Sequence, residues 1–437
     1  MSFSLPHQAF LDPAVLDKIK AFIIGRWEET VRFNQADEGT LLGLPFPYTI
    51  PSRNDVFQEF YYWDTYFTSI GLLLSEREDL ALSNTKNLLA LAERYGFVPN
   101  GNRTYYLHRS QPPYIAALVN AVADTLKDSG LRQAALPTLR REYAFWTTRR
   151  MTPTGLSRYG HDADDKEVFE FAAAVASRIG IEAVSPSDLA IYSHKYAECE
   201  SGWDFNPRFE HRCEDFCPVD LNSLLYLYER FLAEHGDPGE RAHAARQAED
   251  RKARMCELCW DSTRGGFFDY DFKNGRRSPI VSVAALQPLW AGIATQEQAA
   301  LTLEKVVPQL EFAFGIAACA PSSDSRVCQW NYPNGWPCLH HIAYVGLHRY
   351  GHTEAALRIA GKYLATIARV FEETGDLWEK YNVEDGSTRT LNETGYITDD
   401  PRIKDPSAVP DTAPAMMGWT AGVFLDALKF YRTHRSP

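Results

Sequence analysis

Helical periodicity runs through almost the whole chain and limits the possible folds more than any other feature of the sequence. Apolar side chains recur at helical spacing in about a dozen segments, for example at Leu221, Leu224, Leu225, Tyr228 and Leu232. No sustained alternation of apolar and polar residues predicts a β-sheet. Short connectors with glycine breakers between the segments are typical of antiparallel helix pairs. The sequence therefore predicts an all-α protein built from helical hairpins.

The expected helices cover most of the chain. We place them at residues 16–34, 65–74, 79–95, 114–127, 132–149, 162–178, 219–235, 239–260, 281–290, 297–307, 336–350, 354–373 and 414–431. Helices joined in pairs can close into a six-hairpin (α/α)6 barrel, in which loops at one end gather distant residues into one pocket. Polar and aromatic residues concentrate in candidate loops at residues 53–64, 98–113, 196–209, 326–336 and 376–396.

No stretch of the sequence marks a domain boundary. The composition does not shift along the chain, and no linker rich in Pro, Gly or Ser interrupts it. We therefore expect residues 1–437 to form a single (α/α)6-barrel catalytic domain, with residues 1–50 as an N-terminal helix and lead-in loop. Because 45% of its residues are apolar, a chain of this length can bury a large core.

The charge balance indicates which partners to expect. The net charge is −12 and no basic run occurs, which argues against nucleic acid and against an anionic membrane surface. No apolar run reaches the length of about 20 residues that a membrane-spanning helix needs. The N-terminal residues lack the basic and apolar regions of a signal peptide. We therefore expect a cytoplasmic protein; the oligomeric state is not predicted.

The eight cysteines raise the question of a metal site. Cys256 and Cys259, together with Cys213 and Cys217, could be imagined as four thiolate ligands of zinc. However, Cys256 and Cys259 fall one turn apart within an expected helix, and no His pair has matching spacing. We interpret the cysteines as free, mostly buried thiols in a reducing compartment. No metal and no other cofactor is expected.

An acid between two aromatic residues is the first candidate for chemistry. Gly202 allows a tight turn, Trp203 and Phe205 offer flat apolar faces, and Asp204 lies between them. An apolar wall would raise the pKa of Asp204 toward that of a general acid. A helix cap or the edge of the core would also explain the pattern. Ten Trp and 22 Tyr favour a carbohydrate cleft, although an aromatic-rich core is the alternative.

A second acid, Glu379, stands between Trp378 and Lys380 just after a Thr-Gly break. Glycoside hydrolysis needs two such carboxyl groups. One stays protonated to donate to the leaving oxygen, and the other stays ionised to activate water or attack carbon. A surface charge beside Lys380 is the alternative interpretation of Glu379.

Further loop residues fit a sugar pocket. Trp63 and Asp64 combine a stacking face with a carboxylate, while amide and guanidinium groups can bond several hydroxyls each. These groups are carried by Asn100, Arg109, Gln111 and Gln329. A structural ion pair would equally explain Arg109, and a buried loop corner would explain most of the aromatic-rich segment 329–336.

These segments resemble the trehalase family of inverting glycoside hydrolases over roughly residues 45–430. Residues 57–64 are similar to the first family signature, and Pro-Asn-Gly-Asn-Arg-Thr-Tyr-Tyr-Leu-His-Arg-Ser-Gln-Pro-Pro at 99–113 nearly repeats the family's wording. Glu-Ser-Gly-Trp-Asp-Phe at 200–205 resembles the segment of the catalytic acid, and Trp-Glu-Lys-Tyr at 378–381 that of the base. Further matches lie at 218–222, 329–336 and 418–423.

The resemblance implies a six-hairpin barrel, no metal, and inversion at the anomeric carbon. Asp204 would be the general acid and Glu379 the general base. It also implies a small α-glucoside substrate, with trehalose as the default. The expected substrate-binding residues are Phe57, Trp63, Asp64, Asn100, Arg109, Gln111, Trp203, Gln329, Trp330 and Trp419.

Departures from the family concern mainly the leaving-group side. Val56 stands where the family has an Arg, with Arg53 three residues earlier as a candidate replacement. Residues 159–177 contain no Arg, although an Arg-Pro-Glu-Ser segment is expected near 162–171. Asn331 replaces an Asp, and residues 391–396 replace a glycine-rich lid. We therefore expect weakened trehalose hydrolysis and a less hydroxylated leaving group, unless Arg53 fills the missing place.

Alternatives to a trehalase-like hydrolase remain open on the sequence. The same chemistry could act on another small α-glucoside, such as a glucosylated acid, polyol or secondary metabolite. A non-catalytic sugar-binding relative would usually have lost one of the two carboxyls. A helical interaction scaffold would not need the paired Trp and acid residues or the loop at 98–113.

Overall fold

The computed structural model describes residues 10–53, 57–176, 178–179, 181, 183–322, 328–390, 415 and 417–435. The α-helices are α1 (Pro13–Arg26), α2 (Tyr62–Leu73), α3 (Glu78–Tyr95), α4 (Ile115–Leu126), α5 (Ser129–Thr148), α6 (Asp165–Ala174), α7 (Leu189–Glu200), α8 (Val219–His235), α9 (Pro238–Leu258), α10 (Gln287–Ala291), α11 (Gln296–Lys305), α12 (Val307–Leu310), α13 (Pro337–Arg349), α14 (Thr353–Thr374) and α16 (Gly418–His434).

Short elements connect these helices. The 3₁₀ turns are η2 (Trp27–Thr30), η3 (Thr104–Tyr106), η4 (Pro186–Asp188), η5 (Cys213–Asp215) and η6 (Val283–Leu286). The strands are β1 (Val31–Arg32), β2 (Tyr48–Thr49), β3 (Phe216–Cys217), β4 (Trp260–Asp261), β5 (Gly266–Phe267), β6 (Tyr270–Asp271), β7 (Arg276–Arg277), β8 (Glu311–Phe312), β9 (Gly315–Ile316), β10 (Asn334–Gly335) and β11 (Tyr381–Asn382). They pair only into small antiparallel ribbons in the described chain.

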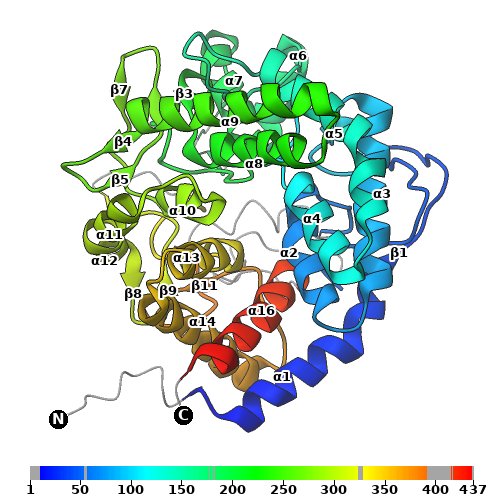
Figure 1. Ribbon diagram of the computed structural model, residues 1–437, viewed down its shortest axis with the longest axis vertical. Coiled ribbons are helices and arrows are strands. Elements are labelled where there is room, and N and C mark those ends of the chain that lie inside the picture. Colours follow the sequence, from blue (N-terminus) through cyan, green and yellow to red (C-terminus); the bar gives the residue numbers. More distant parts are fainter. Residues whose placement is uncertain are drawn as a thin grey trace.

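The helices form a closed double ring. In the part of the chain that the structure describes, α2, α4, α8, α10, α13 and α16 each contact the next, and α16 returns to α2. Outer helices such as α3, α5, α9 and α14 pack around this inner ring, and α1 lies against α14 and α16 (Figure 1). This is the six-hairpin (α/α)6 barrel that the periodicity predicts.

Two glycines allow the ring to close between its first and last inner helices. A Cβ on Gly422 of α16 would lie 1.9 Å from the carbonyl oxygen of Phe67 in α2. A Cβ on Gly71 would lie 2.5 Å from the Cα of Gly422. The two backbones therefore touch at a point where no side chain fits.

The structure corrects several expected boundaries. Residues 196–200, expected in a loop, form the last turn of helix α7, which the periodicity missed. Trp63 and Asp64, also expected in a loop, occupy the first turn of α2. Helix α7 is short and polar along much of its length, and with α6 it shares a small cluster of buried residues, Val168, Ala172 and Tyr192, apart from the main core. A short helix packed on a satellite cluster carries little of the periodic signal that sequence analysis uses. None of the described helices has the length and apolarity needed to cross a membrane.

Candidate active site

A cavity of about 660 Å³ gathers residues from many parts of the ring. This volume is within the range of small-molecule sites. Its lining consists of Phe57, Tyr61, Trp63, Asp64, Asn100, Tyr105, Tyr106, Arg109, Gln111, Phe171, Ala174, Val175, Arg178, Cys199, Gly202, Asp204, Trp330, Trp336, Glu379 and Trp419. Both predicted catalytic carboxyls and most of the predicted substrate-binding residues therefore lie around one space.

The cavity has a buried floor and a more open mouth. The floor residues are buried, and include Trp63, Asp64, Trp330, Glu379 and Trp419. The mouth is formed by half-buried or exposed residues, among them Phe57, Tyr105, Tyr106, Phe171 and Arg178. Asp204 is itself partly exposed, so it stands between floor and mouth.

Two predicted substrate-binding residues do not line this cavity. Trp203 is buried behind it, stacked on Trp330 with ring centroids 5.3 Å apart, and carries the guanidinium of Arg208 on its ring. Gln329 is fully buried and accepts a hydrogen bond from Arg178 through its Oε1 at 2.9 Å. The sequence pattern showed aromatic and amide groups in the right segments, but tertiary packing directs these two side chains away from the cavity.

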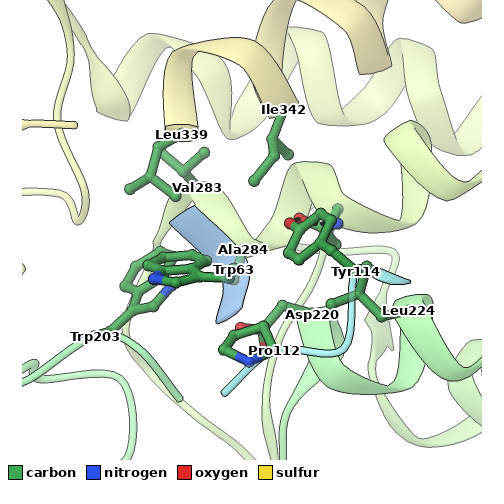
Figure 2. Close-up of a pocket in the computed structure, with 11 residues that line it drawn as sticks. Trp63, Pro112, Tyr114, Trp203, Asp220, Leu224, Val283, Ala284, Leu339 and Ile342 are labelled. Atoms are coloured by element: carbon green, nitrogen blue, oxygen red, sulfur yellow. Dashed lines mark hydrogen bonds between the residues drawn. The ribbon is translucent and has the colours of Figure 1, made fainter. Parts of the chain in front are cut away.

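A second, much smaller cavity lies behind Trp63 and Trp203, among Pro112, Tyr114 and Leu224 (Figure 2). It holds about 10 Å³ and is lined largely by apolar side chains. That is barely the space of one water molecule. This second cavity is therefore too small for a sugar ring.

The turn that carries Asp204 is fixed by buried polar contacts. Gly202 has a φ of 73°, and a Cβ there would lie 2.8 Å from the ring of Trp63. Beyond Asp204, the backbone N–H of Asn206 donates to Glu198 Oε1 at 2.6 Å, and Lys195 donates to the other oxygen at 2.7 Å. Gly202 on one side of the turn and Glu198, which binds the other side, are both buried. The surrounding fold therefore sets the position of Asp204.

Glu379 is held where a short ribbon meets the last helix. Strand β11, which begins two residues later, pairs with β10. The indole N–H of Trp419 donates to the carbonyl oxygen of Glu379 at 3.0 Å, and the hydroxyl of Thr420 donates to the carbonyl of Trp378 at 2.7 Å. The side chain of Glu379 is only 3% exposed and accepts from Lys380 Nζ at 2.6 Å. The alternative of a surface charge beside Lys380 is therefore wrong, because both side chains are buried.

Asp64 is a third carboxyl on the cavity wall. Burial, followed by the negative charges of Glu379 and Asp204, raises the pKa of Asp64 to about 8. At neutral pH this side chain is therefore mostly protonated and can donate a hydrogen bond as well as accept one.

Arg109 supplies a buried positive charge at the cavity. Its Nε donates to Asn100 Oδ1 at 3.0 Å, and its guanidinium lies over the rings of Tyr196 and Tyr106 at 4.8 and 5.1 Å. Within the described ranges no carboxylate forms an ion pair with it. The alternative of a structural ion pair thus finds no support there, and the charge of Arg109 faces the cavity beside Asp204.

The arginine expected as a replacement does not line the cavity, whereas another arginine does. Arg53 forms ion pairs with Glu29 at 2.8 Å and Asp376 at 2.7 Å, and it does not line the cavity. Arg178, which the sequence analysis missed, does line it and donates to the carbonyl oxygen of Asp204 at 3.3 Å. It follows directly after the segment 159–177 that contains no Arg, so a slightly longer window would have found it. Val56 and residues 391–396 lie outside the described residues.

Metal ligands and disulfides were also weighed from the sequence. Among the residues with described positions, no three His, Cys, Asp or Glu side chains are grouped as a metal site would require. The cysteines there form no disulfide, and Cys256 and Cys259 lie at the end of α9, as expected.

Comparisons with known proteins identify the family of this chain. The trehalase family model matches residues 14–432. The periplasmic trehalase of Xanthomonas axonopodis pv. citri is 34% identical over 82% of this chain and 66% of its own length. That of Pseudomonas aeruginosa is 33% identical over 90% of this chain and 72% of its own length. The chain thus spans about two thirds of the length of these relatives.

Solved structures share the fold. The neutral trehalase Nth1 of Saccharomyces cerevisiae superposes with a TM-score of 0.73 and 28% identity, covering 94% of this chain and 80% of that one. A mannosylglycerate hydrolase of Thermus thermophilus gives a TM-score of 0.61 at 17% identity, over 95% of this chain and 100% of that one, which shows the fold alone. The family match and the fold confirm the assignment from sequence: the chain belongs to the trehalase family of glycoside hydrolases.

Proposed function

We propose that this protein is an inverting hydrolase of α-glucosides with α,α-trehalose as its principal substrate. The observation that carries the proposal is that Asp204 and Glu379 line one cavity with different surroundings. Asp204 is partly exposed between floor and mouth, whereas Glu379 is buried against an ammonium group. A general acid and a general base need such contrasting environments.

The cavity suggests how the reaction would run. The glucose ring to be released occupies the floor, where the rings of Trp63, Trp330 and Trp419 offer stacking faces. Asp204 gives its proton to the glycosidic oxygen as the bond to the anomeric carbon breaks. Glu379 takes a proton from a water molecule, whose oxygen bonds to that carbon from the opposite face. The products are one β-glucose and the protonated leaving group, so one water is consumed per bond.

The leaving group would lie at the mouth of the cavity. Helix α6, whose first turn is capped by Asp164 and Glu167, contributes Phe171 and Ala174 there, and Val175 follows it. These three side chains offer no hydrogen bond to a hydroxyl group. They favour, as a second candidate, another small α-glucoside with a leaving group less hydroxylated than glucose. The guanidinium of Arg178 at the same mouth favours trehalose, because it supplies part of the positive charge that the missing family arginines would carry.

Release of reducing sugar from trehalose and from a panel of other α-glucosides tests the proposal. We expect trehalose to be cleaved, and proton NMR of the fresh products to show β-glucose and α-glucose in equal amounts, because the attacked ring is inverted and the leaving glucose keeps its α configuration. Cleavage of another α-glucoside with a higher kcat/KM would favour the second candidate. Release of α-glucose alone from trehalose would contradict inversion, and binding without release would point to a non-catalytic sugar-binding relative.

The cytoplasmic location stays a prediction. The relatives described above are named periplasmic trehalases. Fractionation of cells that produce the protein from its own gene, with markers for each compartment, checks it.

A further inference from the structure

Three carboxyl groups share the cavity, but their positive partners are unevenly distributed. Asp64, Asp204 and Glu379 all line the space, and Asp64 and Glu379 are both buried. Two buried carboxyl groups that interact electrostatically do not both ionise readily, because their negative charges repel and neither is well solvated. The protein must therefore determine which of the two holds a proton.

Lys380 is positioned to determine which of the two carboxyl groups holds the proton. Its side chain is fully buried, and Nζ lies 2.6 Å from Glu379 Oε2. The ammonium also lies 4.7 Å from the centre of the Trp336 ring, which is itself part of the cavity wall. Strand β11 starts at the next residue and pairs with β10, so the backbone on which Lys380 stands is fixed.

Asp64 is not paired in this way. No Lys, Arg or His among the residues that the structure describes forms an ion pair with it. Burial, and after it the negative charges of Glu379 and Asp204, raises its pKa to about 8. Among the residues with described positions, Glu379 therefore has a cation in contact and Asp64 does not.

We infer that Lys380 is a positioning residue that keeps Glu379 ionised and leaves the proton on Asp64. One oxygen of Glu379 is held by the ammonium, and the carboxylate is oriented by that bond. For its catalytic meaning the inference rests on the proposed hydrolase, in which Glu379 activates water. The protonated Asp64 then serves as a neutral hydrogen-bonding group for the sugar instead of adding a second negative charge.

Other ionisable groups around Glu379 come from several elements. They are Asp64 on α2, Cys338 on α13, Asp204 after α7, Tyr381 on β11, and the guanidinium groups of Arg109 and Arg178 across the cavity. Burial keeps the Cys338 thiol and the Tyr381 hydroxyl neutral, because it raises the pKa of both. Arg109 and Arg178 contact other groups, the Asn100 amide and the carbonyl of Asp204 respectively. Lys380, by contrast, donates a hydrogen bond directly to the carboxylate of Glu379.

An infrared titration tests the inference without relying on turnover. Difference spectra of the wild type against Glu379→Gln isolate the carboxyl band of Glu379, and those against Asp64→Asn isolate that of Asp64. In the wild type we expect Glu379 to gain its proton at a lower pH than Asp64. In Lys380→Met the midpoint of Glu379 should rise by about 1–3 pH units, as expected for the loss of an adjacent opposite charge.

Two further variants separate charge from packing. Lys380→Arg keeps the cation, so the midpoint of Glu379 should stay near that of the wild type. Lys362→Met is a matched control, because Lys362 also forms a largely buried pair with a glutamate, Glu311, at 2.7 Å, and Glu311 does not line the cavity. It should leave the midpoint of Glu379 unchanged.

The outcomes decide the inference even if Lys380→Met does not fold. A wild-type Glu379 that gains its proton at a higher pH than Asp64 contradicts it directly. So does a folded Lys380→Met with an unshifted midpoint, or a Lys380→Arg variant that shifts as far as the methionine variant. With an active substrate, the acid limb of kcat/KM should move with the infrared midpoint. Infrared shifts without glucose release would refute the hydrolase proposal alone, whereas glucose release without the shifts would refute the role of Lys380 alone.

Discussion

At the residue scale, the acid and the base differ in how they are held. Asp204 sits on a turn anchored by Glu198, while Glu379 is fixed by the indole of Trp419 and the ammonium of Lys380. Replacing Asp204 by Asn or Glu379 by Gln should each lower kcat by about 10²–10⁴-fold, the usual contribution of a positioned proton transfer. Steady-state rates on the best α-glucoside of the panel check this. Glu384→Gln, an exposed change just beyond β11, is the control and should leave kcat unchanged.

A second residue-scale prediction concerns the arginines. Arg178→Ala removes the bonds to Gln329 and to the carbonyl of Asp204, and hydrogen bonds from charged groups contribute roughly 1.5–3 kcal/mol each. We expect kcat/KM on trehalose to fall by at least about tenfold, since 1.4 kcal/mol corresponds to a factor of ten. Arg53→Ala should affect stability more than kcat/KM, because Arg53 bonds Glu29 and Asp376 away from the cavity. A larger fall in kcat/KM for Arg53→Ala than for Arg178→Ala would mean that Arg53 takes the place of the missing family arginine.

At the scale of elements, the contact between α2 and α16 closes the ring and carries Trp63 and Trp419 to the cavity. Gly422→Ala would place its Cβ 1.9 Å from the carbonyl oxygen of Phe67, so the helices must move apart. We expect a loss of about 1–3 kcal/mol in the free energy of unfolding, measured by urea denaturation. The matched control is Gly25→Ala in α1, where a Cβ meets no atom within 4 Å. That change should stabilise the protein by about 0.5–1 kcal/mol.

The contact between α5 and α8 gives a pH-dependent stability. Glu142 of α5 accepts a hydrogen bond from Tyr228 of α8 at 2.5 Å, and burial raises its pKa to about 7. The folded state thus holds a proton that the unfolded chain loses near pH 4.5, so this group makes stability fall as the pH rises from there to about 7, by about 1.4 kcal/mol per pKa unit. Glu142→Gln should weaken this dependence. Urea denaturation of both proteins at pH 5 and pH 8 measures it, and an equal fall in both would contradict the assignment.

At the scale of the whole molecule, the ring arrangement predicts one folding unit. Each inner helix contacts two neighbours, and the main buried cluster extends from Leu11 near the start to Leu428 in α16. We expect calorimetry to show a single cooperative transition with equal calorimetric and van't Hoff enthalpies. Two separable transitions would contradict the single-domain prediction.

The sequence by itself determined the ring and most of the cavity. Apolar residues at helical spacing predict helices because one stripe of each must be buried, and this signal is local. Asp204 and Glu379 could be predicted because each stands beside a Trp in a short sequence motif, and such a motif is also a local feature. Such local features can be recognised in the sequence without knowing which residues pack against them.

Only the tertiary structure decided which side chains face the cavity. The side chains of Trp203 and Gln329 are buried and do not line the cavity. Arg178, from the poorly periodic segment between α6 and α7, does line it at the mouth. The burial of Lys380 against Glu379 could not be predicted either, because Glu and Lys side chains that are adjacent in the sequence usually lie at the surface. The physical reason is that burial and charge pairing depend on residues far away in the chain, here those of α2, α13 and α16, which only the closed ring brings together.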